Sequence, residues 1–266
     1  MPTERILTTM RKRKQERAMK PLPASQFQER ILGLMDRKHH WAWPHFADGT
    51  LTKDQLKIHF QQEYAVYVRD FPVFLARIHG QNPPAQVRRM LADNIYEEDT
   101  GGLSLGKSHP ELFLAMMEGL GFSEKDFEGA RLLPASRAYR AWLDAVSNRR
   151  DWVLGAAALT IFVEGSISDR QEIQHPSKPR TKDEIEAAIA RHPLVRHHGA
   201  PPACMDLIRA HQAVEAGHRH DAYDMVVGHA VTTAQQKAVL ACLEKSLSLW
   251  LRYRDGVARA CRLQQS

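Results

Sequence analysis

Cysteine is scarce in this chain of 266 residues, which holds only three. They are Cys204, Cys242 and Cys261, and their wide separation matches neither a zinc-binding pair nor a disulfide framework. Long apolar runs are also missing, since no stretch reaches the roughly 18 residues that suggest a membrane-spanning helix. The first residues carry no apolar signal core. We therefore expect a protein of the reducing cytoplasm that does not associate with membranes.

An excess of positive charge is missing from most of the chain, although the whole carries a net charge of +6. Residues 1–20 hold seven basic and two acidic side chains, whereas the rest holds 30 basic and 29 acidic ones. The nearly neutral body is therefore not expected to bind nucleic acid specifically. Residues 1–24 are predicted to be a basic, flexible leader, with a polyanion-binding or organelle-targeting arm as the alternative. Residues 25–266 are predicted to form one folded domain.

Strand signals are few, because no segment alternates apolar and polar residues convincingly and hairpin dipeptides are almost absent. Helix-start signals are frequent instead. A Ser or Thr followed three residues later by Glu or Gln forms a capping box, in which both side chains satisfy free amides of the first turn. Such pairs are Thr52/Gln55, Ser108/Glu111, Thr181/Glu184 and Thr232/Gln235. The fold is therefore predicted to be an all-α bundle.

The predicted helices cover most of residues 25–258. They lie near 25–40, 52–70, 83–99, 109–121, 135–148, 150–170, 181–191, 203–229 and 233–258. Five prolines fall within residues 172–202, which we interpret as a long connection containing one short helix.

Glu164 directly follows an almost entirely apolar run, Trp152 to Val163. A carboxylate buried at such a place is costly unless it is paired or bound to a metal. The sequence leaves three interpretations open: a metal ligand, a wet helix end, or a partner for a structural arginine.

His211, Glu215 and His218 are spaced at i, i+4 and i+7 in a predicted helix. At 3.6 residues per turn, the three side chains share one face. Two imidazoles and a carboxylate projecting together suit a first-row transition metal. A polar, solvated face is the alternative in a chain with 14 histidines.

Glu97 and Glu98 end one predicted helix, and His109 begins the next after a glycine-containing loop. Carboxylates at a helix C-terminus are disfavoured by the helix dipole, which weakly favours a cation partner. The spacing does not decide which of the two glutamates would be the ligand.

Taken in order, these residues resemble the ligand set of the haem-oxygenase-like di-metal oxidases. The matching positions are Glu98, His109, Glu164, His211, Glu215 and His218. That family belongs to the larger group of pyrroloquinoline-quinone synthase C and TenA-like (thiaminase II) proteins. Asn94 stands four residues before Glu98, as in the family motif, and WPHFADGTLTKDQLKIHFQQEY, the Phe71-Pro72 step and SHPELFLAMMEGLGF are also similar. The resemblance covers residues 25–256.

The chain departs from the family pattern in three places. Glu215 stands where Asp is usual, which lengthens that arm by one methylene. The loop between Glu98 and His109 is longer than expected. Residues 172–202 look like an insertion and are expected to reshape the entrance for a substrate.

The resemblance implies a haem-oxygenase-like helical bundle that holds two iron ions, with manganese as an alternative, and activates dioxygen to oxidise a small organic substrate. Six protein ligands would leave open positions on the metals. Tyr64 and Tyr67 are predicted to share a helix face and to line the catalytic pocket, although ordinary packing is an alternative for both. The expected partners are the substrate, dioxygen and a second copy of the chain in a homodimer.

Two other functions are considered. A relative of the quinone synthase would oxidise its substrate with dioxygen and no metal, and would not need both Glu98 and His211. A non-catalytic helical binding protein would make the six candidate ligands coincidental. The thiamine-hydrolysing relatives use a mid-chain cysteine, and no cysteine precedes Cys204 here.

Overall fold

The protein folds as a helical bundle in the computed structural model, which describes residues 20–149, 151–176 and 178–265, without the side chains of 213–218. No strand occurs in these ranges. The α-helices are α2 (Ala24–Met35), α3 (Trp43–Ala47), α4 (Lys53–Glu63), α5 (Phe71–His79), α6 (Ala85–Thr100), α7 (His109–Gly119), α8 (Pro134–Ser147), α9 (Trp152–Ala156), α10 (Asp169–Gln174), α11 (Lys182–Arg191), α12 (Pro193–His198), α13 (Asp206–Val227) and α14 (Thr233–Ala260). The predicted all-α class is confirmed.

Four helices begin where capping boxes were predicted. Both hydrogen bonds of the box are present at the starts of α4, α7, α11 and α14. At α7, for example, the Ser108 hydroxyl accepts from the Glu111 amide while the Glu111 carboxylate accepts from the Ser108 amide. These bonds are local in sequence, which explains why the sequence alone located them.

Two π-helical segments interrupt the bundle: η1 (Tyr64–Val68), after α4, and η3 (Ala157–Val163), after α9. In a π-turn each amide bonds to the carbonyl five residues earlier, and such turns are frequent at functional sites. The amide of Glu164 accordingly donates to the carbonyl of Leu159 at 3.2 Å. The wider turns change which side chains face each other, so expectations based on 3.6 residues per turn fail locally.

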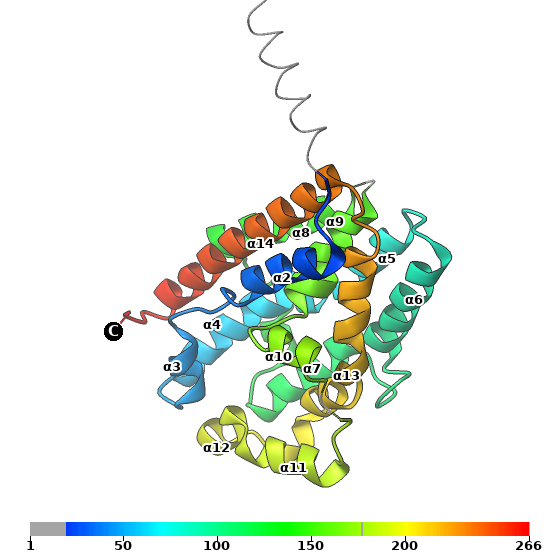
Figure 1. The fold of residues 1–266 in the computed structure, drawn as a ribbon. Helices are drawn as coiled ribbons and strands as arrows, with labels where there is room; N and C mark the ends of the chain where they lie inside the picture. The colour runs from blue at the N-terminus through cyan, green and yellow to red at the C-terminus, as the bar shows by residue number, and fades with distance from the viewer. Residues whose placement is uncertain (1–19, 150, 177, 266) are drawn as a thin grey trace, which may run out of the picture.

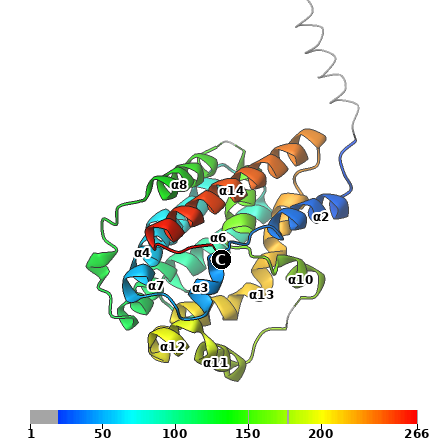
Figure 2. The ribbon, with the colours of Figure 1, turned by 90° about the vertical axis from the view of Figure 1, so that its left-hand side faces the viewer.

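The core is built around η3 and α14. The side chains of Ala157 to Phe162 are all buried, and α14 packs along α8, α2 and η3. Figure 1 and Figure 2 both show α14 (orange to red) lying beside α2 and α8. A second apolar cluster joins α4 and α7 to the start of α13. Within the described residues, no helix is long and apolar enough to cross a membrane.

Several predicted helix boundaries are wrong. The helix expected over 25–40 ends at Met35, and the one expected over 150–170 ends at Val163 before a new helix begins at Asp169. The connection 172–202 holds α12 as well as the single helix foreseen. Pro193 begins α12 as its first helical residue, a position where the missing amide costs nothing. In Figure 1, α11 and α12 form the lower end of the molecule.

Candidate metal centre

A cavity of about 140 Å³ lies among four of the six residues predicted as metal ligands. Glu98 comes from α6, His109 from α7, Glu164 from the end of η3 and His211 from α13. The remaining wall is formed by Tyr67, Val68, Phe71, Val163 and Leu207. Residues far apart in the sequence therefore meet at one small, partly apolar space.

His109 is held between two carboxylates. Its Nδ1 lies 3.0 Å from Glu98 Oε1, and its Nε2 lies 3.2 Å from Glu97 Oε1. Burial alone would lower the pKa of His109, but the two glutamates outweigh it and raise that pKa. Although Nδ1 is buried and close to Glu98, it has no hydrogen-bond partner of acceptable geometry among the described residues. A buried imidazole nitrogen without such a partner is available to a metal.

Glu97 and Glu98 have different surroundings. Glu97 is 1% exposed and accepts hydrogen bonds from the Leu103 amide at 2.8 Å and from the Ser104 hydroxyl. It does not line the cavity, whereas Glu98 does. The geometry therefore makes Glu98 the candidate ligand and gives Glu97 two other tasks: it closes the loop after α6 and fixes the outer nitrogen of His109.

Glu164 is paired with an arginine, one of the possibilities that the sequence left open. Its Oε2 accepts from Arg219 Nη2 at 2.8 Å, and its Oε1 accepts from Asn94 Nδ2 at 2.9 Å. Arg219 also donates to the carbonyl of Thr160. Burial raises the pKa of Glu164 to about 7 although Arg219 lowers it. Sequence reasoning missed Arg219, because nothing in its local pattern marks a partner 55 residues away.

His211 faces His109 across the cavity, with ring centroids 5.0 Å apart. Burial lowers the pKa of His211 to about 4, so the imidazole is neutral at physiological pH. A neutral imidazole is the form that binds metals. His211 thus lies inside the bundle and lines the cavity, and its role as a ligand stays a prediction.

The remaining two predicted ligands, Glu215 and His218, lie outside the residues whose side chains the structure describes. Among the described side chains, no group of three or more His, Cys, Asp or Glu is arranged closely enough to hold a metal ion. The donor set nevertheless suits a first-row transition metal, since two carboxylates and two imidazoles line one cavity. The open Nδ1 of His109 supports the same fit.

The two predicted pocket tyrosines have different positions. Tyr67 lines the candidate metal cavity, and its hydroxyl donates to Glu63 Oε1 at 2.8 Å. Tyr64 instead stacks on Phe113, with ring centroids 5.4 Å apart, and lines none of the cavities described in this section. Both residues lie in η1, where the π-turn separates positions that an α-helix would bring to one face.

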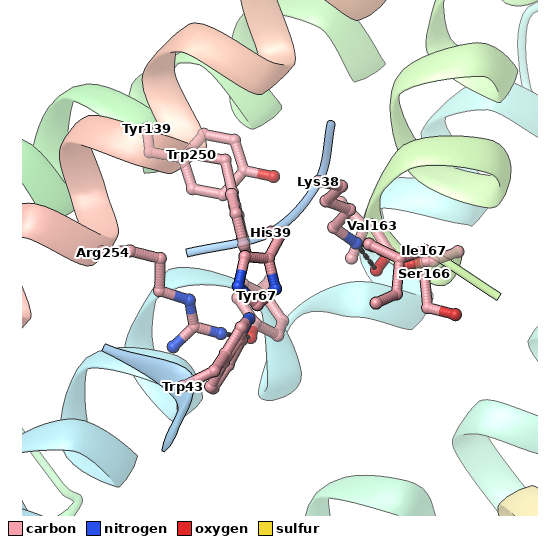
Figure 3. Close-up of a pocket in the computed structure, with 11 residues that line it drawn as sticks. Lys38, His39, Trp43, Tyr67, Tyr139, Val163, Ser166, Ile167, Trp250 and Arg254 are labelled. Carbon is pink, nitrogen blue, oxygen red and sulfur yellow. Dashed lines mark hydrogen bonds between the residues drawn. The ribbon is translucent and has the colours of Figure 1, made fainter. Parts of the chain in front are cut away.

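Two larger cavities adjoin the first. One, of about 520 Å³, is mostly apolar; it shares Tyr67, Val68, Leu207 and His211 with the metal cavity and reaches Pro193 and Leu194 of α12. The other, of about 320 Å³, shares Tyr67 and Val163 with it and contains Lys38 and Arg254 (Figure 3). Tyr67 thus belongs to the walls of all three.

Comparison with known proteins agrees with this geometry. Residues 58–251 match a protein family described as iron-containing redox enzymes. The match covers well over half of the chain. This chain belongs to that family.

Relatives of this iron-containing redox enzyme include three chlamydial proteins named 4-aminobenzoate synthase. The protein from Chlamydia muridarum is 26% identical over 115 residues, which are 42% of this chain and 47% of that protein. The protein from Chlamydia pneumoniae is 23% identical over 123 residues, or 46% and 53% of the two chains. The chain therefore matches about half the length of these relatives.

Solved structures show that the redox enzyme has a haem-oxygenase-like fold. A TenA homologue from Pseudomonas syringae superposes with a TM-score of 0.63 at 15% identity, covering 91% of this chain and 98% of the other. A domain with a haem-oxygenase-like fold from Shewanella denitrificans superposes with a TM-score of 0.61 at 19% identity, covering 98% of this chain and 95% of the other. A CADD-like protein from Nostoc punctiforme superposes with a TM-score of 0.62 at 14% identity, covering 90% of this chain and 98% of the other.

Proposed function

We propose that this redox enzyme holds two iron ions, which it uses with dioxygen to oxidise a small organic substrate. The observation that carries the proposal is the meeting of Glu98, His109 and Glu164 with His211 around one cavity. Glu215 and His218 complete the proposed ligand set. Manganese accepts the same donors, so a manganese or mixed centre is included.

The side chains around the cavity have distinct tasks in this proposal. Glu98 and Glu164 would bind through carboxylate oxygens, His109 through Nδ1 and His211 through an imidazole nitrogen. Glu97 would hold His109 in position through its outer nitrogen at 3.2 Å. Carboxylates that orient a ligating histidine in this way raise its basicity and fix its ring.

Bound ferrous ions would supply electrons for the reduction of dioxygen. The side chains of the protein would control the access of water to the cavity and the protonation of the groups around it. Val68, Phe71, Val163 and Leu207 give the cavity an apolar wall that limits water. Tyr67 keeps its proton at physiological pH, because burial and Glu63 raise its pKa well above the usual value. That proton is donated to Glu63 at 2.8 Å, so the Tyr67 oxygen would orient a substrate by accepting a hydrogen bond from it.

The substrate in this proposal is a small organic molecule. The relatives named 4-aminobenzoate synthase make formation of that acid one specific activity to be assayed. The chain is further proposed to act as a cytoplasmic homodimer, without specific nucleic-acid binding.

The test is to purify the full chain without oxygen, load it with Fe²⁺, and measure bound iron and dioxygen consumption. His211→Ala should lower both, with the helical content unchanged, because one ligand is lost from a cavity wall. His192→Ala is the control, since His192 lines the apolar cavity but not the metal cavity. Equal iron content in both variants and in the native chain would contradict the proposal.

A second candidate is a metal-independent oxidase, and the pairing of Glu164 with Arg219 favours it. In that case Arg219 would be the permanent partner of Glu164 and dioxygen would react without iron. The two candidates differ in a direct measurement: a metal-independent enzyme keeps its turnover after exhaustive treatment with a chelator, whereas a di-iron enzyme loses it and regains it on addition of Fe²⁺.

A further inference from the structure

The cavity of about 320 Å³ beside the metal cavity has an unusual lining. Its aromatic walls are Trp43, Tyr67, Tyr139 and Trp250, and they surround the space between Lys38 and Arg254 in Figure 3. Among the described residues, no Asp or Glu lines it. Two basic side chains line the cavity, and the acidic partner of Arg254, Glu63, is not among the lining residues.

Arg254 is the permanent cation of the cavity. Burial lowers the pKa of Lys38 to about 7, and the Lys38 ammonium already donates to the carbonyls of Phe162, Val163 and Gly165. The Arg254 guanidinium lies over the face of Trp43, 4.4 Å from the ring centroid. An arginine stacked in this way is held rigidly and keeps its charge.

Two buried donors at this cavity lack partners among the described residues. Arg254 uses Nη2 for Glu63 at 2.5 Å and Nη1 for His59 at 3.4 Å, but its Nε has no hydrogen bond. The hydroxyl of Tyr139 has none either. Arg254 is 6% exposed and Tyr139 is 0% exposed. Buried donors without partners destabilise the fold, so a ligand that accepts from them is favoured.

We propose that this cavity binds a small aromatic carboxylate, whose two oxygens accept from Arg254 Nε and from the Tyr139 hydroxyl. Two unused donors match the two oxygens of a carboxylate. A phosphate is disfavoured because it carries more charge than Arg254 alone balances, and the ammonium of Lys38 is already occupied by three carbonyls. The ring of the ligand would pack against Trp43 and Trp250, which line the same space.

The position of the cavity connects this ligand with the metal centre. Tyr67 and Val163 belong to the walls of both cavities, and Val163 directly precedes Glu164. A carboxylate held at Arg254 would therefore lie in the cavity next to the metal cavity. That this acid is the substrate rests on the function proposed above, whereas its binding does not.

The experiment uses the full chain in its metal-free form, titrated calorimetrically with benzoate, with the neutral benzamide and with inorganic phosphate. Benzoate should bind, and benzamide and phosphate should bind at least tenfold more weakly. Tyr139→Phe should weaken benzoate binding about tenfold, the value of one hydrogen bond to a charged group. Without ligand, its melting temperature should not fall, because the lost hydroxyl has no hydrogen-bond partner in the described part of the protein.

Tyr253→Phe is the matched control. Tyr253 stacks on Tyr139 at 5.7 Å and its hydroxyl is also buried, interacting with Tyr67, but it does not line the cavity. The Tyr253→Phe variant should bind benzoate as tightly as the native chain does. Equal loss in both variants, or equal binding of benzoate and benzamide, would overturn the inference. Because the titration needs no iron, loss of the di-iron function would leave its result unchanged, and a failed titration would leave the di-iron function standing.

Discussion

Glu97 and Glu98 are neighbours in sequence with separate tasks in the structure. Glu98→Gln should lower the iron content, because Glu98 lines the metal cavity and faces His109 Nδ1 at 3.0 Å. Glu97→Gln should retain more iron than Glu98→Gln. It should lower the melting temperature, because Glu97 is buried and accepts a hydrogen bond from the Leu103 amide. Iron analysis and thermal unfolding of both variants test this division of tasks between the two glutamates. The reverse pattern, with iron lost only in Glu97→Gln, would show that the ligand was assigned to the wrong glutamate.

Arg219 neutralises Glu164 in the metal-free chain. Arg219→Gln should destabilise that form by about 3 kcal/mol, since a buried carboxylate loses its charged partner. Added Mn²⁺ or Fe²⁺ should then raise the melting temperature more than in the native chain, because the metal supplies the missing positive charge. Arg170→Gln is the control: its pairs with Glu29 and Asp36 are exposed, and such pairs contribute about 1 kcal/mol or less. An identical metal-induced shift in Arg219→Gln and native protein would speak against Glu164 as a ligand.

At the scale of elements, the end of η3 decides where Glu164 is presented. Lys38, just beyond α2, donates to the carbonyls of Phe162, Val163 and Gly165, which surround Glu164 in sequence. Carbonyls at a helix end need such partners when they are buried. Lys38 therefore anchors the segment from which the carboxylate extends.

Lys38→Met should destabilise the fold by about 3 kcal/mol, because buried carbonyls lose their donor. It should also weaken iron binding, since Glu164 loses its fixed position. Lys245→Met is a suitable control, because Lys245 is exposed and lies over the ring of Trp142 without a helix end to support. Chemical denaturation and iron titration measure the two effects. Native iron affinity in a destabilised Lys38→Met would limit Lys38 to a structural role.

At the scale of the whole molecule, Leu22 is joined to α14 by two hydrogen bonds. Its amide donates to Gln236 Oε1 at 2.8 Å, and Gln236 Nε2 donates back to its carbonyl at 3.0 Å. The charge asymmetry of the sequence predicts that residues 1–20 contribute little to the fold. The last residues of the expected leader, in contrast, are tied to α14.

Deletion of residues 1–20 should leave the melting temperature and the iron content unchanged. Deletion of residues 1–23 should lower the melting temperature, because Gln236 is 5% exposed and would lose both bonds to the chain. Thermal unfolding of the two truncated proteins, compared with the full chain, gives the answer. A large loss of stability in the shorter deletion would mean that the basic segment packs on the body.

The sequence alone was sufficient for the helical class and for four helix starts, and it singled out His109 and His211, which the structure places at one cavity. These conclusions rest on bonds and spacings within a few residues, such as the box of Ser108 and Glu111, and on a family pattern carried by residue order. The resemblance to a di-metal oxidase agrees with the iron-containing redox family to which the chain belongs.

Only the tertiary structure decided what each polar side chain meets. The pairing of Arg219 with Glu164 joins residues 55 positions apart, and the cavity at Arg254 combines α14 with α8 and with residues near Lys38. It also separated Glu98 from Glu97, and Tyr67 from Tyr64, where a π-turn replaced the expected α-turn. Such contacts depend on how helices pack against one another, and local sequence carries no signal for them because the partners are not neighbours in the chain.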